Sequence, residues 1–252
     1  MPHVRIIPRL DIKGPNVVKP VHTEALRVVG QPAEMAAKYY AEGADELIYL
    51  DIVASLYQRN LDFELLKSVS EKIFVPLTVG GGIRSIHDIT NALRAGADKV
   101  AINTYAVQHP EFLSEAVKFF GSQCIVLYVE AKRVAIGKWE AYTDGGRERS
   151  GVDVVEWIRQ ALARGIGEII ITSIDHDGTK TGFELGLVKA VTSFSPVPVI
   201  AHGGARDVES IRQVCVEGKA DAVAVSSIFH YNEIAIGAVK HELAENHVSV
   251  RL

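Results

Sequence analysis

The chain has 252 residues, of which 48% are apolar, and a formal net charge of −4. Charges of both signs are interspersed without a basic block, so we expect no nucleic-acid partner. The sequence contains no run of about 18 apolar residues, so we expect no membrane span. The N-terminal segment lacks the apolar stretch of a signal peptide, and we therefore expect a cytoplasmic protein without a membrane anchor. The two cysteines, Cys124 and Cys215, do not have the spacing of metal ligands, and we expect neither a metal nor a cofactor.

Short β-branched runs alternate with longer runs of helical period along the chain. The predicted strands are residues 5–10, 47–51, 76–79, 99–102, 124–129, 169–173, 198–201 and 222–225. Among the predicted helices are residues 33–41, 86–95, 152–163, 208–216 and 232–245. Eight strands, each followed by a helix, indicate parallel crossovers and a closed (β/α)₈ TIM barrel. No linker divides the chain, so residues 1–252 are predicted to form a single domain.

The sequence of the first half is repeated in the second. PLTVGGGIRSIHDI (76–89) aligns with PVIAHGGARDVESI (198–211), and ADKVAINT (97–104) aligns with ADAVAVSS (220–227). LDIK (10–13) aligns in the same way with VEAK (129–132), at an offset of about 120 residues throughout. Two sequence-related half-barrels are therefore expected, with equivalent residues on opposite sides of the barrel.

Two carboxylates lie at predicted strand ends, where the catalytic residues of this fold are found. Asp11 follows the first strand and Glu130 follows the fifth. The repeat places them opposite each other, so one could act as general base and the other as general acid on a substrate between them. A lone carboxylate at such a position is as readily a solvated strand-end acid, but the symmetric pair favours catalysis.

Glycines follow the third and seventh predicted strands, and small polar residues follow the fourth and eighth, so the same pattern occurs in each half of the chain. Glycine permits positive φ and close approach of the backbone to a ligand, and the small polar groups complete a nest for an anion. Because the pattern occurs in both halves, it predicts two phosphates on opposite sides of the barrel mouth. Tight turns alone would explain the glycines but not the polar residues. The candidates are Gly81, Gly82, Asn103 and Thr104 in the first half and Gly203, Gly204, Ser226 and Ser227 in the second.

Two loops provide further candidates. DHDGTKTG (175–182) follows the sixth strand, which carries Thr172, and its Asp177 and Gly178 are placed to cap a helix or contact substrate. Residues 14–30 form a predicted loop that is long for this fold and typical of a lid. From the residues alone, a solvated surface lysine is the better interpretation of Lys19 within it.

The segments RIIPRLDIK, ADELIYLDI, PLTVGGGIRS, AGADKVAINT, FGSQCIV, DGTKTG and IFHYNE resemble the cyclase subunit of imidazole glycerol phosphate synthase, the HisF family, and the resemblance covers essentially the whole chain. It implies an enzyme of histidine biosynthesis that takes ammonia from a partner glutaminase, HisH. The ammonia is joined to a ribulosyl aminoimidazole-carboxamide nucleotide with two phosphates, giving imidazole glycerol phosphate and a purine-biosynthesis intermediate. The resemblance implies acid–base chemistry for Asp11 and a mobile-loop contact for Lys19. It implies substrate or phosphate binding for Gly82, Asn103, Thr104, Asp177, Gly204 and Ser227.

Four charged residues at strand starts point inward by strand alternation: Arg5, Glu46, Lys99 and Glu168. Alternating charges can form a salt-bridged ring that closes the bottom of the barrel. The resemblance implies that this ring gates ammonia entry, and that nearby Asp98 lies at the interface with the glutaminase, at the N-terminal face of the barrel. Without the resemblance, a plug that satisfies buried charges is the simpler interpretation.

Three residues near the mouth depart from the family pattern. The family has Asp where this chain has Glu130, Cys where it has Arg9, and Ser where it has His202. The extra methylene of Glu130 moves its carboxyl by about 1 Å, a displacement that can cost roughly 100-fold in rate. A cation at Arg9 is expected to lower the pKa of neighbouring carboxylates.

These departures leave three functions open. The leading hypothesis is the ammonia-using cyclase of histidine biosynthesis. The second is a HisF-like paralogue that supplies ammonia for amidination of a surface-polysaccharide sugar. The third, a non-catalytic scaffold that only binds and activates a glutaminase, is disfavoured by the two intact phosphate patterns.

Overall fold

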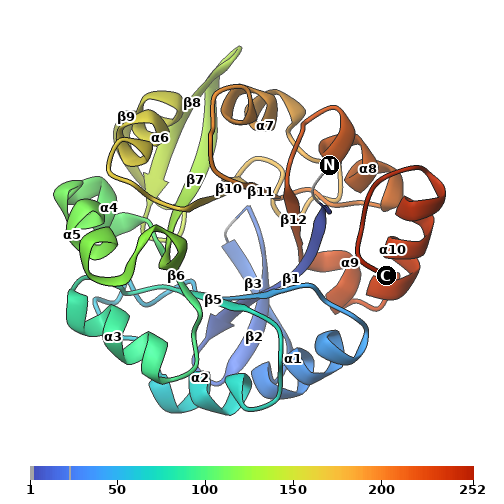
Figure 1. Cartoon of the computed structure of the whole chain (residues 1–252), viewed down its shortest axis with the longest axis horizontal. Coiled ribbons are helices and arrows are strands. Elements are labelled where there is room, and N and C mark those ends of the chain that lie inside the picture. Colours follow the sequence, from blue (N-terminus) through green and yellow to red (C-terminus); the bar gives the residue numbers. More distant parts are fainter. Residues whose placement is uncertain (1–2, 23) are drawn as a thin grey trace.

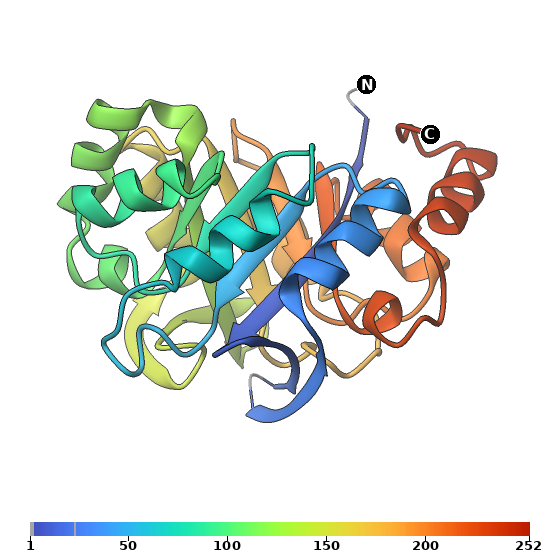
Figure 2. The same cartoon turned by 90° about the horizontal axis from the view of Figure 1, so that it is seen from below.

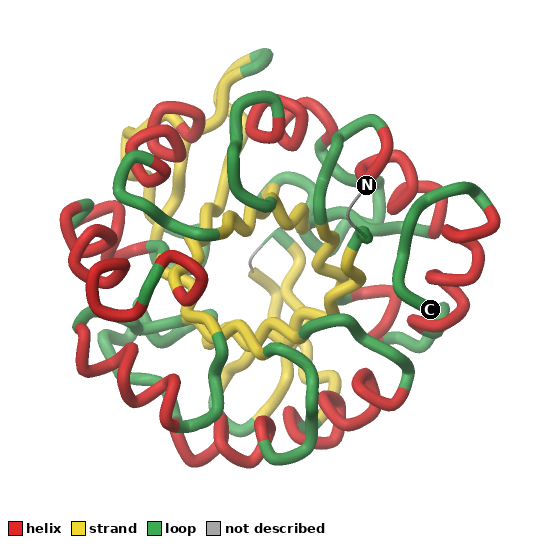
Figure 3. The backbone as a smooth tube through the Cα atoms, in the orientation of Figure 1, coloured by secondary structure: helices red, strands yellow, loops and turns green. Residues whose placement is uncertain are grey.

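The computed structural model describes residues 3–22 and 24–252; Met1, Pro2 and Thr23 of the predicted domain lie outside this range. In the described part of the chain, eight parallel strands form a closed ring surrounded by helices (Figures 1 and 3). In order around the ring they are β1 (Arg5–Lys13), β4 (Leu47–Asp51), β5 (Leu77–Gly80), β6 (Lys99–Ile102), β7 (Ile125–Ala135), β10 (Glu168–Ser173), β11 (Val199–His202) and β12 (Ala222–Val225). The pairing of β12 with β1 closes the ring, and the predicted TIM barrel is confirmed.

Helices follow the barrel strands and pack on the outside of the ring. They are α1 (Pro32–Ala41), α2 (Phe63–Ser70), α3 (Ile86–Arg94), α4 (Thr104–Gln108), α5 (Glu111–Phe120), α6 (Val154–Leu162), α7 (Leu185–Thr192), α8 (Val208–Val216), α9 (Ser227–His230) and α10 (Ile236–Glu245), with a short 3₁₀ turn η1 (Ser122–Cys124) before β7. None of these helices is long and apolar enough to cross a membrane.

The predicted strand bounds are correct for β4, β6 and β12 and differ by one residue at some other ends. Two helix predictions begin too early. The predicted helix 152–163 begins at Val154, since Val152 belongs to β9 (Glu148–Asp153). The predicted helix 232–245 begins at Ile236, because Asn232 adopts a positive φ of 55° that no α-helix accommodates.

The prediction of a long loop at residues 14–30 is wrong. Strand β1 continues past the barrel to Lys13 and pairs with β2 (Asn16–Val21), which pairs with β3 (Glu24–Gly30). The second half repeats this feature, with β7 running on to Ala135 and pairing with β8 (Lys138–Thr143) and β9. Both extensions lie on the side away from the chain termini (Figure 2).

The two halves of the barrel are related as the repeat predicts. Strand β1 is four positions from β7 around the ring in either direction, and the same holds for β5 and β11 and for β6 and β12. Asp11 and Glu130 lie inside the extended strands β1 and β7, opposite Val18 and Tyr142 of the hairpins, rather than after the strand ends. The structure therefore confirms that the two carboxylates come from opposite strands.

The glycines after β5 and β11 are required by the backbone. Gly81 and Gly204 both have a φ of +101°. A Cβ at Gly81 would lie 2.2 Å from the carbonyl oxygen of Asp51, and one at Gly204 would lie 2.1 Å from that of Gly182. Each turn thus brings two strand-end segments into direct backbone contact at the mouth.

We predict that Gly81→Ala lowers the free energy of unfolding more than Gly137→Ala. Both residues have positive φ, of 101° and 69°, so both substitutions meet the cost of about 1–2 kcal/mol for a left-handed residue. Only Gly81 adds a steric overlap, because nothing lies within 4 Å of a Cβ built at Gly137 in its hairpin turn. Urea unfolding of the two variants measures the difference, and equal losses would contradict the close approach at Gly81.

Candidate active site

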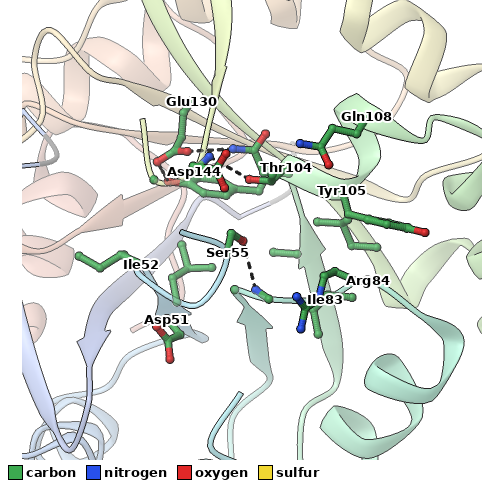
Figure 4. A pocket seen from close by; sticks show the side chains of 18 of the residues that line it. Asp51, Ile52, Ser55, Ile83, Arg84, Thr104, Tyr105, Gln108, Glu130 and Asp144 are labelled. Carbon is green, nitrogen blue, oxygen red and sulfur yellow. Dashed lines mark hydrogen bonds between the residues drawn. The ribbon is translucent and has the colours of Figure 1, made fainter. Parts of the chain in front are cut away.

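The mouth of the barrel contains two cavities on opposite sides, which we call the first and second nests. The first nest has a volume of about 340 Å³ and is lined by Gly81, Gly82, Asn103, Thr104 and Glu130 (Figure 4). The second nest has a volume of about 10 Å³. It is lined by seven of the predicted residues, Lys19, Asp177, Gly178, Gly203, Gly204, Ser226 and Ser227. The structure therefore brings the two predicted groups together as two separate sites.

The first nest also contains polar residues that the sequence did not single out. Ser55 accepts a hydrogen bond from the backbone N–H of Gly82 at 3.4 Å, and Arg84 and Gln108 line the wall (Figure 4). The hydroxyl of Thr104 accepts a hydrogen bond from the backbone N–H of Asp144 at 3.0 Å, which connects the β8–β9 turn to the nest. Of these residues, only Arg84 had a usable sequence signal, as a cation two residues beyond the glycine run.

Lys19 closes the second nest. Its ammonium group is 2.9 Å from Asp177 Oδ1, and the two residues are 3% and 2% exposed. The interpretation of Lys19 as a solvated surface lysine is wrong. A Cβ at Gly178 would lie 2.5 Å from the carbonyl oxygen of Pro20, so strand β2 packs directly on the loop after β10. The hairpin that carries Lys19 therefore covers this nest.

Glu130 is buried beside the first nest, with one hydrogen bond to each carboxyl oxygen. Asn103 Nδ2 donates to Oε2 at 2.8 Å, and the Tyr128 hydroxyl donates to Oε1 at 3.1 Å. Burial raises the pKa of Glu130 to about 7, although the charge of Arg9 and the Tyr128 hydrogen bond act to lower it. Arg9 thus acts on the pKa of Glu130 in the expected direction, but desolvation outweighs the cation and the net change is upward.

Asp11 is fully buried and paired with a cation. Arg9 Nε donates to its Oδ1 at 2.8 Å, and Lys19 Nζ is 3.9 Å from its Oδ2, which has no hydrogen-bond partner among residues 3–22 and 24–252. Burial is the largest single effect on the pKa of Arg9 and acts to lower it, but Asp11, Tyr128 and Asp177 together raise it above its ordinary value, so the guanidinium remains charged. Asp11 is thus held by Arg9 through Oδ1, and its Oδ2 remains available as an acceptor.

Arg9 connects the other residues of the inner mouth. Its Nη1 is 3.0 Å from Thr172 Oγ1 and 2.9 Å from His202 Nδ1, and its guanidinium lies 5.3 Å from the centre of the Tyr128 ring. Thr172 lines neither nest and lies between them as part of this network. The three departures from the family pattern therefore belong to one connected group, Arg9 with His202 directly and with Glu130 through Tyr128.

The four charges at the other end of the barrel form the predicted ring. Arg5 is 2.6 Å from Glu46 and 2.8 Å from Glu168, and Lys99 is 3.1 Å and 2.8 Å from the same two carboxylates. Each glutamate bridges the two cations, so the ring is continuous. The geometry fits either a gate or a permanent plug.

Asp98 is exposed at the start of β6, and its carboxylate accepts a hydrogen bond from the backbone N–H of Leu77 at 2.8 Å. Its repeat equivalent Asp221 does the same for Val199 at 2.9 Å. Asp98 therefore stabilises the edge of β5 whether or not a partner is bound, and its position at an interface remains a prediction.

Among the described residues, no group of three or more His, Cys, Asp or Glu side chains is arranged to hold a metal ion. The chemistry available at the mouth comes from the two carboxyl groups, the buried cations and the backbone N–H groups of the nests.

Comparison with known proteins gives consistent matches. The model of the family described as histidine biosynthesis protein matches residues 5–235. The chain is 58% identical over 204 residues to imidazole glycerol phosphate synthase subunit HisF of Legionella pneumophila, covering 81% of this chain and 96% of that protein. It is 48% identical over 248 residues to the subunit of the same name of Helicobacter hepaticus, covering 98% of each chain.

The raised pKa of Glu130 predicts a pH-dependent loss of stability. Its folded pKa of about 7 exceeds the ordinary value of 4.5, so between these pH values the folded state binds more protons than the unfolded state. Stability should therefore fall by roughly 3 kcal/mol at most as the pH rises from about 4 to 8. The comparison is made on urea unfolding curves of the wild type and Glu130→Gln, with Glu148→Gln, an exposed acid on β9, as the control. Glu130→Gln should remove this decrease, and an unchanged pH profile would contradict the raised pKa.

Proposed function

This chain belongs to the HisF family of histidine biosynthesis proteins, and on that premise we propose that it is the cyclase subunit of imidazole glycerol phosphate synthase. It joins ammonia to a ribulosyl aminoimidazole-carboxamide nucleotide with two phosphates. The observation that carries the proposal is the placement of two nests on opposite sides of a mouth that holds Asp11 and Glu130. A substrate with a phosphate at each end would place its reacting centre between the two carboxyl groups.

The two carboxyl groups have different roles in this proposal. Glu130, with a pKa of about 7, exists in both protonation states at neutral pH and can donate and accept a proton during turnover. Asp11 pairs with Arg9 through Oδ1 and offers Oδ2 as a free acceptor. Such a division lets one site supply a proton and stabilise positive charge at the same time.

Ammonia enters at the opposite end of the barrel in this proposal. A HisH-like glutaminase docks at the N-terminal face near Asp98, and the ring of Arg5, Glu46, Lys99 and Glu168 gates the passage. Above the ring, the barrel interior is lined by apolar side chains, among them Ile7, Ile48, Val126, Ile170 and Ile200. An apolar interior favours the neutral molecule over ammonium. We place the complex in the cytoplasm.

One observation favours a second candidate, a HisF-like paralogue that supplies ammonia for amidination of a surface-polysaccharide sugar. The resemblance implies acid–base chemistry for Asp11. In this chain, however, Arg9 extends across the mouth and forms an ion pair with Asp11, which neutralises its charge. In that case the barrel conducts ammonia and binds a two-phosphate ligand without catalysing cyclisation.

We predict that the chain catalyses cyclisation of the two-phosphate nucleotide with saturating ammonium and no partner. Glu130→Gln should reduce the rate by about 100- to 10,000-fold, because an amide cannot exchange the proton. Asp11→Asn should reduce it by a similar factor, because the two carboxyl groups act from opposite sides of one substrate and the amide lacks the charge of the carboxylate. Glu130→Asp should retain or raise the rate, and Glu148→Gln is the matched surface control. Substrate affinity should remain largely intact in all of these variants, since the phosphates are held elsewhere.

The contrary outcome separates the two candidates. A wild-type chain that binds the two-phosphate nucleotide but shows no cyclisation at saturating ammonium excludes the cyclase and supports the amidination paralogue.

The gate gives a further prediction. Glutamine hydrolysis by the partner should rise when this chain is added. Lys99→Met should lower glutamine-dependent cyclisation relative to ammonium-dependent cyclisation by about 2- to 30-fold, the range for residues that couple two sites. Lys118→Met, at an exposed lysine on α5, should leave the ratio unchanged. Unaltered hydrolysis on mixing would count against both amidotransfer functions.

A further inference from the structure

His202, at the end of β11, connects the inner mouth to the second nest. Its side chain is buried, with an exposed fraction of 4%, and it lines the nest directly before Gly203 and Gly204. On the side of the barrel axis, its Nδ1 is 2.9 Å from Arg9 Nη1 and 3.2 Å from Thr172 Oγ1. Neither Arg9 nor Thr172 lines the nest, so the imidazole ring bridges the two regions.

These contacts determine the protonation of the ring. A guanidinium group has donors only, so His202 Nδ1 must be the acceptor in its contact with Arg9 and carries no proton. The Thr172 hydroxyl, which accepts a bond from Arg9, can donate to the same nitrogen. Burial, and then the charges of Arg9 and Lys19, lower the pKa of His202 well below its usual range. The ring is therefore neutral, with its single N–H at Nε2.

Among the described residues, both side-chain hydrogen bonds of His202 are at Nδ1, and its Nε2 is not one of the fully enclosed polar atoms that lack a partner. The Nε2–H is therefore not used by the protein and remains accessible from the nest that His202 lines. Because the Nδ1 edge of the ring faces Arg9 and Thr172, the remaining polar atom lies on the side of the nest. The Nε2–H of His202 is thus available to a ligand at the turn formed by Gly203 and Gly204.

We infer that His202 is an anion-binding residue of the second nest, where its Nε2–H donates to a phosphate oxygen of the substrate. Arg9 acts as a positioning residue, since its contact with Nδ1 fixes the tautomer. The inference rests on the proposed function, which takes the second nest as a phosphate site. It adds the imidazole of His202 as a donor, at a position where the family pattern has serine. The bond is formed by an uncharged ring, so the charge of Arg9 remains beside Asp11.

Phosphate binding requires the nest to open. Its volume of about 10 Å³ is that of roughly one water molecule. Lys19 is the residue that closes it, through its ion pair with Asp177. The contact between Lys19 and Asp177 must therefore loosen for a phosphate to bind.

The test uses histidine nitrogen-15 NMR on the full chain, with inorganic phosphate as the probe. In the free protein, His202 should show an unprotonated Nδ1 and a protonated Nε2. On titration, the His202 Nε2–H signal should shift together with the backbone amides of Gly203 and Gly204. His241, exposed on α10, serves as the reference that should not move.

Two substitutions test the donor by affinity. Gln places its side-chain N–H₂ near the position of Nε2, whereas Asn reaches only as far as Nδ1. His202→Asn should weaken phosphate binding by about 10- to 100-fold, as expected for a hydrogen bond to a charged group, and His202→Gln should remain within about threefold of the wild type.

Each contrary outcome has a distinct meaning. Shifts at Gly203 and Gly204 with no change at His202 Nε2 overturn the inference and leave the phosphate nest intact. A proton on Nδ1 in the free protein, or equal losses in the Asn and Gln variants, also overturns the inference alone. No shift at any of these groups overturns both the inference and the second phosphate site of the proposed function.

Discussion

The ion pair between Arg9 and Asp11 is the interaction on which the chemistry of the mouth depends. Both groups are almost fully buried, with exposed fractions of 3% and 0%, and their Nε–Oδ1 distance is 2.8 Å. Breaking a buried pair by removing one partner leaves an uncompensated charge and typically costs about 3–5 kcal/mol. Arg9 is therefore fixed in place, and its remaining donors determine the orientation of Thr172 and the tautomer of His202.

A duplicated framework here produces two unequal halves. The repeat makes Asp11 equivalent to Glu130 and Arg9 equivalent to Tyr128. In one half a carboxylate is neutralised by a cation; in the other, a carboxyl hydrogen-bonded by Tyr128 and Asn103 has its pKa raised to about 7 by burial. The nests differ in the same way, since Lys19 closes one and the other is open. Symmetry of the backbone thus positions the groups, and the side chains around each carboxyl assign its role.

The sequence predicted the features that depend on local pattern and on strand alternation. The apolar runs of β4, β6 and β12 gave correct bounds, and the inward alternation of Arg5, Glu46, Lys99 and Glu168 gave the charge ring. The β2–β3 and β8–β9 hairpins were missed, because their strands pair with extensions of β1 and β7 that the barrel alone does not require. The burial of Lys19 was missed because its partner, Asp177, is 158 residues away in the chain. The pKa of Glu130 depends on the balance of desolvation and charge, which a sequence does not give.

The central claim is that Glu130, one of the two opposed carboxyl groups, exchanges its proton at neutral pH. Carbon-13 NMR of the Glu130 side-chain carboxyl, followed as a function of pH in the wild-type chain, measures this directly. The account predicts a midpoint of about 7, and a midpoint at the ordinary value of 4.5 would contradict it.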